Sequence, residues 1–221
     1  MIKVEAIEVF GIEGAMRGMR NPLNSWDKAD TTVSDDILEI GENDLNLATR
    51  LIKAGTEHRK FLRMIHVQMD VIAPLYWWKE ADTYKVGTTT NSCSTMHKIA
   101  AKEFTLDDFS HDHLFNDAVV YNGYVSTSVL KCVIGALNEF RNLYLETKDK
   151  RYWWQRIQLL PSSYNQRRTW DMSMETLLSI LHQRKNHKLD EWNEFRDICL
   201  EQVPYVKEFY EASLKETTNE N

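Results

Sequence analysis

The apolar positions along the chain follow two different periods. Alternation with a period of two marks residues 2–10 and, most clearly, residues 65–71, where one face carries Ile65, Val67, Met69 and Val71. Because successive side chains of a β-strand point to opposite faces, both segments are predicted to be strands. Residues 15–35 show neither period and are rich in Asn, Asp, Gly and Thr, which predicts an irregular segment.

Helical spacing describes most of the remaining apolar residues. Residues 42–54 have that spacing and are predicted to form a helix with Asn43 as its N-cap and Gly55 as its stop. Pro74 suits the first turn of a helix that runs through roughly Tyr84. Further helices are predicted at residues 126–147, 174–184, 189–203 and 204–215. The first of these is expected to pack through the apolar stripe Val129, Cys132, Val133, Ala136, Leu137 and Phe140.

No internal repeat, low-complexity linker or shift in composition divides the 221-residue chain. It is long enough to bury a substantial core, and 43% apolar and 27% charged residues are ordinary for a globular protein. We therefore expect one α+β domain over residues 1–215, followed by a polar tail at residues 216–221.

Charge and cysteine content narrow the function classes. The net charge of −6 excludes a global basic field for nucleic acid, whereas a small anion needs only a local cluster of arginines. No apolar run approaches the roughly 18 residues of a membrane span, and the N-terminus lacks the apolar core of a signal peptide, so we expect a cytoplasmic protein. Cys93, Cys132 and Cys199 form no CxxC motif and support neither a zinc site nor a disulfide framework.

Residues 83–97, TYKVGTTTNSCSTMH, gather small hydroxyl and amide side chains. Such side chains hydrogen-bond to their own backbone and compete with helix, so the segment is predicted to be a loop. Its N–H and hydroxyl groups can also converge on an anionic ligand. Cys93 lies beside Asn91 and Ser94 and is either an inert thiol or a nucleophile, for which His97 is the candidate base.

Basic residues supply further candidates. Arginine suits bidentate contacts to phosphate, and the C-terminal half carries Arg156, Arg167, Arg168 and Arg184, with His187 close by. Solvated surface positions also explain these charges, and a cation at the end of a helix, such as Arg184, complements the helix dipole. His111 and His113 would need a third ligand to hold a metal, and none is evident, so no metal is expected.

The aromatic residues are expected mainly in the core, with a minority able to stack on a heteroaromatic ring. The tryptophans concerned are Trp77, Trp78, Trp153, Trp154, Trp170 and Trp192. The common nucleotide-binding and hydrolase motifs GxGxxG, GxxxxGKS/T and GxSxG are absent. Any nucleotide would therefore be held by a less familiar arrangement.

The segment LLPSSYNQRRTWDMSMETLLSILHQRKNHKLDEWNEF resembles the C-terminal half of the flavin-dependent thymidylate synthases. That family shows an Arg shortly before Leu-Pro, a strand with a Trp, a helix of the form SLLxFxxLR and then HAQWEIR. The matching residues are Arg156, Leu160, Pro161, Trp170, Leu177, Leu178, Arg184, His187 and Trp192. Gly55, TEHRKF, the strand that follows and Ala73-Pro74 are similar to the family's GHESPFEH, strand and helix, so the resemblance spans about residues 1–210.

The family's signature RHRxxSxNExSxR falls on residues 83–97 and is altered. Thr83, Tyr84 and Lys85 stand where RHR belongs, and the positions of the two Ser and the last Arg hold Thr88, Cys93 and Thr95. A shift by one residue instead matches Asn91 and Ser94 to NExS. All three signature arginines are absent under either alignment, and only Lys85 retains a positive charge.

The resemblance implies an α+β fold with helices packed on a small, mostly antiparallel sheet, assembled as a homotetramer that binds FAD at subunit interfaces. It implies reductive methylation of dUMP or a related pyrimidine nucleotide, with NADPH and methylenetetrahydrofolate as co-substrates. Since the flavin does this chemistry without a covalent protein nucleophile, no catalytic residue is assigned.

The resemblance also implies which residues hold the ligands. The implied cofactor contacts are His58, Tyr84, Lys85, Asn91, Ser173, Arg184 and His187. The implied substrate contacts are Glu80, Thr88, Cys93, Ser94, Arg156 and Arg184. Two alternatives stay open: a non-catalytic nucleotide- or flavin-binding paralogue on the same fold, and an unrelated helical interaction module suggested by the C-terminal amphipathic helices.

Overall fold

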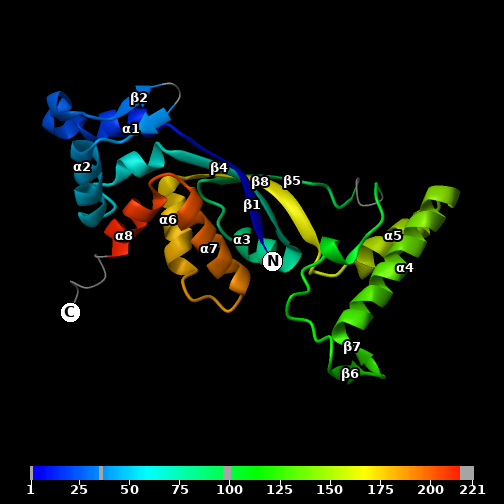
Figure 1. Ribbon diagram of the computed structural model, residues 1–221. Helices are drawn as coiled ribbons and strands as arrows, with labels where there is room; N and C mark the ends of the chain where they lie inside the picture. The colour runs from blue at the N-terminus through cyan, green and yellow to red at the C-terminus, as the bar shows by residue number, and fades with distance from the viewer. Residues whose placement is uncertain (1, 35–36, 97–100, 215–221) are drawn as a thin grey trace. The chain divides into compact units, whose positions relative to one another are not determined.

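A computed structural model describes residues 2–34, 37–96 and 101–214 (Figure 1). Its helices are α1 (Ile12–Met19), α2 (Glu42–Lys53), α3 (Leu75–Ala81), α4 (Ser126–Thr147), α5 (Lys150–Leu159), α6 (Met174–Gln183), α7 (Asp190–Gln202) and α8 (Val206–Leu214). Its strands are β1 (Lys3–Phe10), β2 (Thr32–Ser34), β3 (Ile37–Glu39), β4 (His66–Pro74), β5 (Thr88–Ser92), β6 (Val119–Tyr121), β7 (Tyr124–Val125) and β8 (Asn165–Ser173). The predicted α+β class is confirmed.

The main sheet has the strand order β1-β4-β8-β5. The Ile65 carbonyl accepts a hydrogen bond from the Met174 N–H at 2.8 Å, and the Tyr164 carbonyl accepts one from the Leu75 N–H at 3.0 Å. Residue numbers therefore rise along β4 as they fall along β8, which makes this pair antiparallel. The side chains of β4 alternate, and the buried ones are Val67, Met69, Val71 and Ala73. The predicted strands at residues 2–10 and 65–71 are confirmed.

The chain divides into two compact units, each assembled from separate segments. Unit 1 contains Met1–Lys3, Val71–Thr83 and Asn91–Arg168, and unit 2 contains Val4–Asp70, Tyr84–Thr90 and Thr169–Asn221. Four of the five boundaries fall inside strands of the main sheet, one in each strand, and the fifth, after Thr83, lies between α3 and β5. The domain predicted over residues 1–215 stays a prediction, and the tail at residues 216–221 lies outside the described residues.

The prediction of an irregular segment at residues 15–35 is wrong for its first part, which belongs to α1. The helix begins after Gly11, where φ is 81° and an added Cβ would lie 2.4 Å from the Met64 carbonyl oxygen. Its buried residues have the spacing i, i+3, i+4 and i+7: Ile12, Ala15, Met16 and Met19. Two further glycines in the helix weakened the sequence signal, and packing of this face outweighs their low helix propensity.

α2 confirms the helix predicted at residues 42–54 but corrects its cap. The N-cap position is Gly41, and the Asp30 carboxylate accepts hydrogen bonds from the N–H groups of Asn43 at 2.8 Å and Asp44 at 2.9 Å. The predicted Asn43 cap is therefore wrong, because a side chain from outside the helix satisfies these donors. Asp44 also pairs with Arg20 at 2.6 Å, with both side chains at most 3% exposed.

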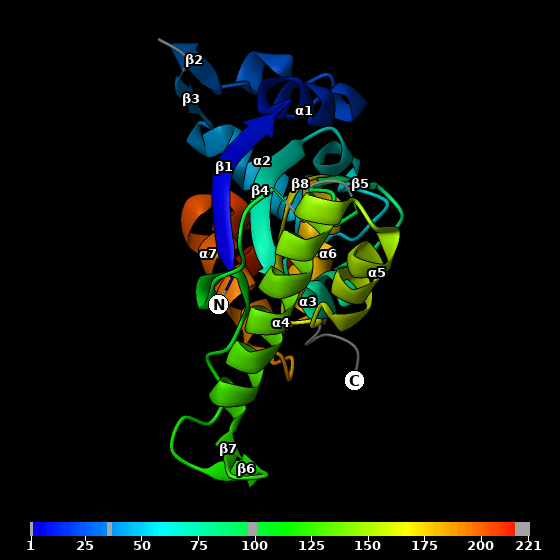
Figure 2. The same cartoon turned by 90° about the vertical axis from the view of Figure 1, so that its right-hand side faces the viewer.

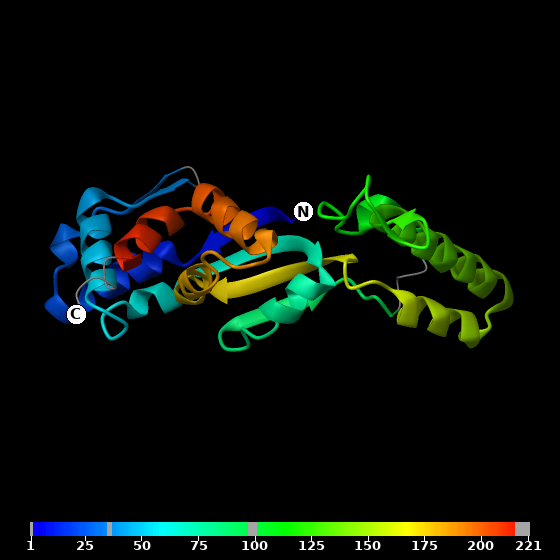
Figure 3. The same ribbon diagram turned by 90° about the horizontal axis from the view of Figure 1, so that it is seen from below.

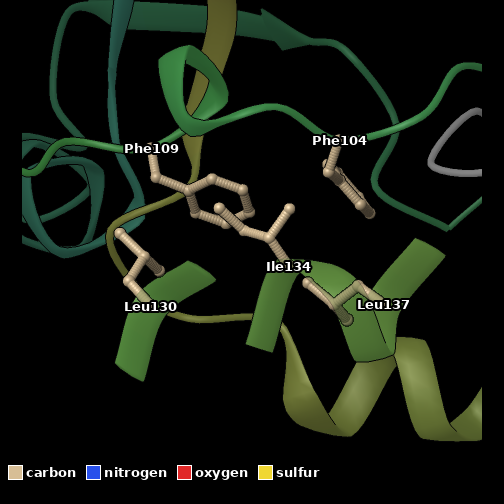
Figure 4. Close-up of a cluster of buried hydrophobic side chains, with 5 residues drawn as sticks. All are labelled: Phe104, Phe109, Leu130, Ile134 and Leu137. Carbon is tan, nitrogen blue, oxygen red and sulfur yellow. The ribbon is translucent and has the colours of Figure 1, made fainter. Parts of the chain in front are cut away.

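α4 has the predicted bounds, but the predicted packing stripe is only partly confirmed. Of that stripe, Leu137 is buried and Val133 packs against the core, whereas Val129 and Cys132 are exposed. The other buried residues of the helix are Thr127, Leu130 and Ile134. Leu130, Ile134 and Leu137 form a core in unit 1 with Phe104 and Phe109 (Figure 4). α5 packs along α4 (Figure 3). The apolar surface of α4 is therefore wider than the part that packs against the rest of unit 1.

The loop predicted at residues 83–97 is wrong in its middle. Residues 88–92 form β5, an edge strand beside β8, and the Cys93 N–H continues the pairing to the Arg167 carbonyl at 2.9 Å. The β-branched threonines favour a pleated strand, and β8 provides the pairing partner. The preceding helix α3 ends at Ala81 and does not reach Tyr84, and His97 lies outside the described residues.

Candidate functional site

Arg184 is the centre of a polar and aromatic cluster in unit 2. α6 positions it, since Arg184 is the C-cap and its N–H donates to the Ile180 carbonyl at 2.9 Å. Its Nε donates to the Tyr84 hydroxyl at 2.8 Å. The guanidinium carbon lies 5.2 Å from the ring centroid of Tyr84 and 4.7 Å from that of Trp192. Two aromatic side chains, Tyr84 through its ring and hydroxyl and Trp192 through its ring, therefore orient a half-buried cation.

His187 completes the cluster and introduces a conflict. Its Nδ1 accepts a hydrogen bond from the Leu189 N–H at 3.1 Å, while Arg184 Nη1 lies 3.1 Å from its Nε2. A neutral imidazole has one acceptor nitrogen, and Arg184 can only donate. Both contacts cannot be hydrogen bonds at once. Arg184 therefore gains a better acceptor when an anionic oxygen approaches it.

Tyr84 begins a tight turn that leads into β5. Its carbonyl accepts a hydrogen bond from the Thr88 hydroxyl, and Gly87 has a φ of 73°. The turn leaves Lys85 exposed, and Asn91 is exposed on β5. The structure thus brings Tyr84, Arg184 and His187 together, whereas Thr88 closes the turn through its hydroxyl and Lys85 and Asn91 face solvent.

A pocket of about 470 Å³ lies along the polar face of α6 in unit 2. It is lined by Arg59, Leu62, Glu175, Leu178, Ser179, His182, Gln183, Lys185, Ser213 and Leu214. Glu175 accepts from Arg59 Nε at 3.3 Å and also pairs with Arg63. Its lining includes chain neighbours of predicted cofactor residues: Arg59 follows His58, Glu175 is near Ser173, and Lys185 follows Arg184.

His182 has a fixed orientation in this pocket. Ser213 Oγ donates to the Tyr210 carbonyl at 2.7 Å, so the 2.6 Å contact to His182 Nε2 requires the imidazole to donate. The ring stacks on Tyr210 with centroids 4.4 Å apart. Burial, together with Arg59 and Lys185, lowers the pKa of His182, so it is neutral at pH 7. As a donor to Ser213 it does not activate that hydroxyl as a base.

Two of the predicted cofactor residues, Ser173 and His58, lie apart from the Arg184 cluster. Ser173 caps α6, where its Oγ accepts from the Thr176 N–H at 3.2 Å. His58 is exposed in a turn, with its N–H donating to the Gly55 carbonyl at 3.0 Å. The structure does not bring His58 or Ser173 into the Arg184 cluster through a described hydrogen bond.

Arg156 is the most buried of the predicted substrate residues and belongs to unit 1. Its side chain is fully buried on α5, and Nε, Nη1 and Nη2 have no hydrogen-bond partner in the described part of the chain. Its guanidinium carbon lies 5.7 Å from the centroid of the Tyr144 ring. Burial, with the nearby Arg141, lowers the pKa of Arg156. A buried guanidinium with three unsatisfied nitrogens is the chemistry that an anion would complete.

The other predicted substrate residues of unit 1 lie around the end of α3 and after β5. Glu80 is half-buried, and its carbonyl accepts from the Thr83 hydroxyl at 2.7 Å. Cys93 is an exposed free thiol whose carbonyl accepts from Gln166 Nε2 at 2.7 Å. The Ser94 hydroxyl accepts from the Met96 N–H at 3.3 Å. These contacts organise the backbone of the segment.

Arg168, one of the candidate phosphate contacts, is used within unit 1. It lies 4.4 Å over the Trp78 ring and donates to Asp82 at 2.7 Å and to Gln166 Oε1 at 3.0 Å. The tryptophan prediction holds for Trp77, Trp78, Trp170 and Trp192, which are buried, while Trp154 is 45% exposed.

Sequence reasoning missed the pocket residues on α6 and α8. A signal was present: Glu175, Ser179 and His182 repeat at helical spacing on the face of α6 opposite to Leu177 and Leu181. Ser213 comes from a distant helix and has no sequence signal.

Residues 2–34, 37–96 and 101–214 contain neither a cluster of metal-ligating side chains nor a helix that could span a membrane. Within them, no group of three or more His, Cys, Asp and Glu gathers around one point. His111 Nδ1 lies 2.8 Å from the Phe109 carbonyl oxygen. None of the described helices is long and apolar enough to span a bilayer.

The fold is that of known enzymes. The structure resembles a crystal structure of thymidylate synthase X (ThyX) from Helicobacter pylori with FAD and dUMP, with a TM-score of 0.68 and 16% sequence identity over 96% of this chain and 99% of that chain. A second structure, flavin-dependent thymidylate synthase ThyX from Helicobacter pylori complexed with FAD and dUMP, gives a TM-score of 0.67 and 16% identity over 95% and 99%. No protein-family model and no curated protein sequence matches this chain. The fold implied by the sequence resemblance is confirmed.

Proposed function

We propose that this protein is a divergent flavin-dependent thymidylate synthase that methylates dUMP or a related pyrimidine nucleotide in the cytoplasm. The observation that carries the proposal is the contact between Tyr84 and Arg184. The sequence resemblance assigns Tyr84 to the altered signature and Arg184 to the C-terminal motif, 100 residues away, and their side chains lie 2.8 Å apart. The altered signature and the C-terminal motif, which the resemblance expects in one site, thus contribute residues to the same cluster.

FAD is the proposed cofactor, and the residues of unit 2 fit it. The α6 pocket offers cations, Arg59 and Lys185, for a pyrophosphate, with Leu62, Leu178 and Leu214 as apolar surface. The solved structures that share the fold are complexed with FAD and dUMP. When bound and reduced by NADPH, FAD would supply the hydride with which the carbon carried by methylenetetrahydrofolate becomes the methyl group of dTMP.

The chain's own residues would bind and orient the ligands. Arg184, held by Tyr84 and Trp192, would exchange its contact with His187 for an anionic oxygen. Arg156 would bind phosphate once the ligand reaches its buried nitrogens. We further propose a homotetramer, as the resemblance implies, in which a second copy completes the site.

A non-catalytic nucleotide- or flavin-binding paralogue is the second candidate. The observation that favours it is the altered signature: Thr83, Tyr84 and Lys85 replace three basic residues, and Lys85 is exposed in the turn before β5. Such a protein would bind FAD or nucleotide through the same cluster without turnover.

Reconstitution separates the candidates. Purified protein is incubated with FAD, freed of excess ligand and examined for flavin absorbance, and dTMP formation is then measured with dUMP, methylenetetrahydrofolate and NADPH. Bound flavin with dTMP formation supports the enzyme, and bound flavin without product for any pyrimidine nucleotide supports the paralogue. A chain that retains no flavin overturns the enzyme, and a chain that binds neither flavin nor any pyrimidine nucleotide overturns both proposals.

A further inference from the structure

Glu175 places a carboxylate among the cations of the α6 pocket. The residue lies in the first turn of α6, which the chain enters directly from β8 (Figure 2). Its side chain is 18% exposed and lines the pocket together with Arg59 and Lys185. The pocket proposed for the pyrophosphate of FAD therefore contains an anion of the protein itself.

Two arginines share this carboxylate. Its Oε1 accepts a hydrogen bond from Arg59 Nε at 3.3 Å, and Arg59 is 20% exposed. Its Oε2 accepts one from Nε of Arg63, whose Nη2 also lies 3.5 Å from Oε1 and whose side chain is 56% exposed. Arg63 ends the 3₁₀-helix η3 (Lys60–Arg63), and Arg59 is its N-cap. Glu175 thus has one cationic partner in the pocket lining and a second that is more open to solvent.

Stabilisation of the fold accounts for only part of this arrangement. An acidic residue in the first turn of a helix complements the helix dipole, and the two ion pairs join α6 to η3. The dipole favours negative charge near the N-terminus of α6 but needs no guanidinium partner. Ion pairs that keep contact with water add little stability, as for the exposed Arg63. Neither effect explains why the carboxylate binds Arg59 beside a cavity of about 470 Å³.

Charge determines what can bind next to Glu175. A phosphate oxygen that approaches Arg59 competes with the Glu175 carboxylate for the same guanidinium, and two anions so close to each other repel. Binding of phosphate therefore requires Glu175 to leave Arg59. Arg63 already contacts the carboxylate and can hold it alone, so the exchange leaves no half-buried anion without a partner.

We propose that Glu175 competes with phosphate for Arg59. In the unliganded protein it binds both arginines, and when a phosphate binds Arg59 it stays with Arg63 alone. Glu175 thereby lowers the affinity of the pocket for phosphorylated flavins relative to uncharged riboflavin, which needs no such exchange. Glu175 is then a specificity-determining residue, and Arg63 is a positioning residue that acts through it. This assignment deepens the proposed FAD site and rests on it.

The first experiment removes the charge of Glu175 and keeps the size of its side chain. Glu175→Gln is expected to raise the affinity for FAD about tenfold and to leave that for riboflavin within about twofold, as flavin fluorescence titration measures. The matched control is Asp197→Asn on α7, whose carboxylate pairs with Arg196 at 2.7 Å and does not line the pocket. Both affinities of the control are expected to stay unchanged. Unchanged or weaker FAD binding by Glu175→Gln, or an equal gain for riboflavin, overturns the proposal.

The second experiment tests the exchange at Arg63. Arg63→Ala leaves Glu175 without a partner once phosphate takes Arg59, so FAD affinity is expected to fall about three- to tenfold. In the Glu175→Gln background there is no anion to hold, and the same change is expected to alter FAD affinity less than about twofold. Arg63 is exposed, so the variant is expected to fold, which circular dichroism checks. Equal losses in both backgrounds would mean that Arg63 contacts the ligand directly, and would overturn the exchange.

Inorganic pyrophosphate separates this inference from the proposed function. If neither the wild-type chain nor Glu175→Gln binds FAD, the proposed enzyme is overturned, and calorimetry with inorganic pyrophosphate then tests the pocket alone. Tighter binding of pyrophosphate by Glu175→Gln than by the wild type supports the competing role of Glu175. Equal binding, or no binding by either protein, overturns it.

Discussion

At the residue scale, Arg184 is the proposed contact to an anionic ligand. Arg184→Ala removes a guanidinium held by Tyr84 and Trp192. A charge-assisted contact is worth about 1.5–3 kcal/mol, so FAD or nucleotide binding is expected to weaken roughly 10- to 150-fold while the protein stays folded. Flavin fluorescence titration measures the affinity, and circular dichroism checks the fold.

Arg168 provides the control for this change. It is equally an arginine beside a tryptophan, but its partners are Trp78 and Asp82 in unit 1. Arg168→Ala is expected to leave flavin affinity within about twofold. Full flavin occupancy in Arg184→Ala, or equal losses in both variants, would remove Arg184 from the site.

The pair of Arg20 and Asp44 is a second residue-scale feature, and it concerns stability. Burial on its own raises the pKa of Asp44, but hydrogen bonds from Thr31, Arg20 and the backbone outweigh it, so the pKa of Asp44 is lowered. Asp44→Asn leaves Arg20 buried without a counter-charge and is expected to lower the free energy of unfolding by about 3–5 kcal/mol at pH 7.

The pH dependence of this pair has a definite sign. A carboxyl whose folded pKa lies below its unfolded value of about 3.9 stabilises the protein above that value, and the contribution disappears as pH falls through the folded pKa. The gap between wild type and Asp44→Asn is therefore expected to narrow below about pH 4. Urea unfolding at pH 7 and pH 3 measures this difference in the free energy of unfolding. The control is Asp27→Asn at an exposed position, which is expected to change the free energy of unfolding little at either pH. A gap that is constant with pH contradicts the assignment.

At the element scale, the start of α2 depends on a residue outside the helix. Asp30→Ala removes the acceptor for the N–H groups of Asn43 and Asp44 and is expected to destabilise the protein by about 0.5–2 kcal/mol. Asn43→Ala, which removes the cap expected from the sequence, is expected to have little effect. Thermal unfolding of the two variants decides between the caps, and the reverse order of their effects would restore Asn43.

The elements show which sequence signals were sufficient. Alternation at residues 65–71 and helical spacing at residues 126–147 predicted β4 and α4, because long periodic segments need little tertiary information. The buried face of α4 was only partly predicted: Leu137 was included, but Leu130 and Ile134 were not, because the helix is apolar on more than one side. The positions of Phe104 and Phe109 determine which side is buried. β5 was missed because threonines that favour turns also favour strands once β8 lies beside them.

Part of the candidate site could likewise be predicted from the sequence, and part could not. The resemblance brought Tyr84, Arg184 and His187 into one list, and the structure puts them in contact. Spacing alone does not show that Ser173 is used as a helix cap or that Arg156 is fully buried. Both depend on how distant segments pack.

At the scale of the whole molecule, the chain keeps the fold of the Helicobacter pylori enzyme while 16% of the aligned residues are identical. A fold survives such divergence because the pattern of buried positions, rather than particular side chains, determines it. A ligand site does not, since each charged contact depends on one side chain. The altered turn at Tyr84 and Lys85 is therefore the place where function is expected to differ.

The last prediction follows from that difference. With Thr83, Tyr84 and Lys85 in place of three basic residues, even two lost contacts of about 1.5–3 kcal/mol each weaken dUMP binding on the order of 10²- to 10⁴-fold. Calorimetry of this protein and of the Helicobacter pylori enzyme, measured side by side, is expected to show this difference in dUMP affinity. The variant Lys85→Ala is expected to bind the nucleotide more weakly still. The chain is then expected not to support growth of a thymidine-requiring strain. Robust growth without thymidine, with tight dUMP binding, would mean that the remodelled turn works as a substitute for the arginines.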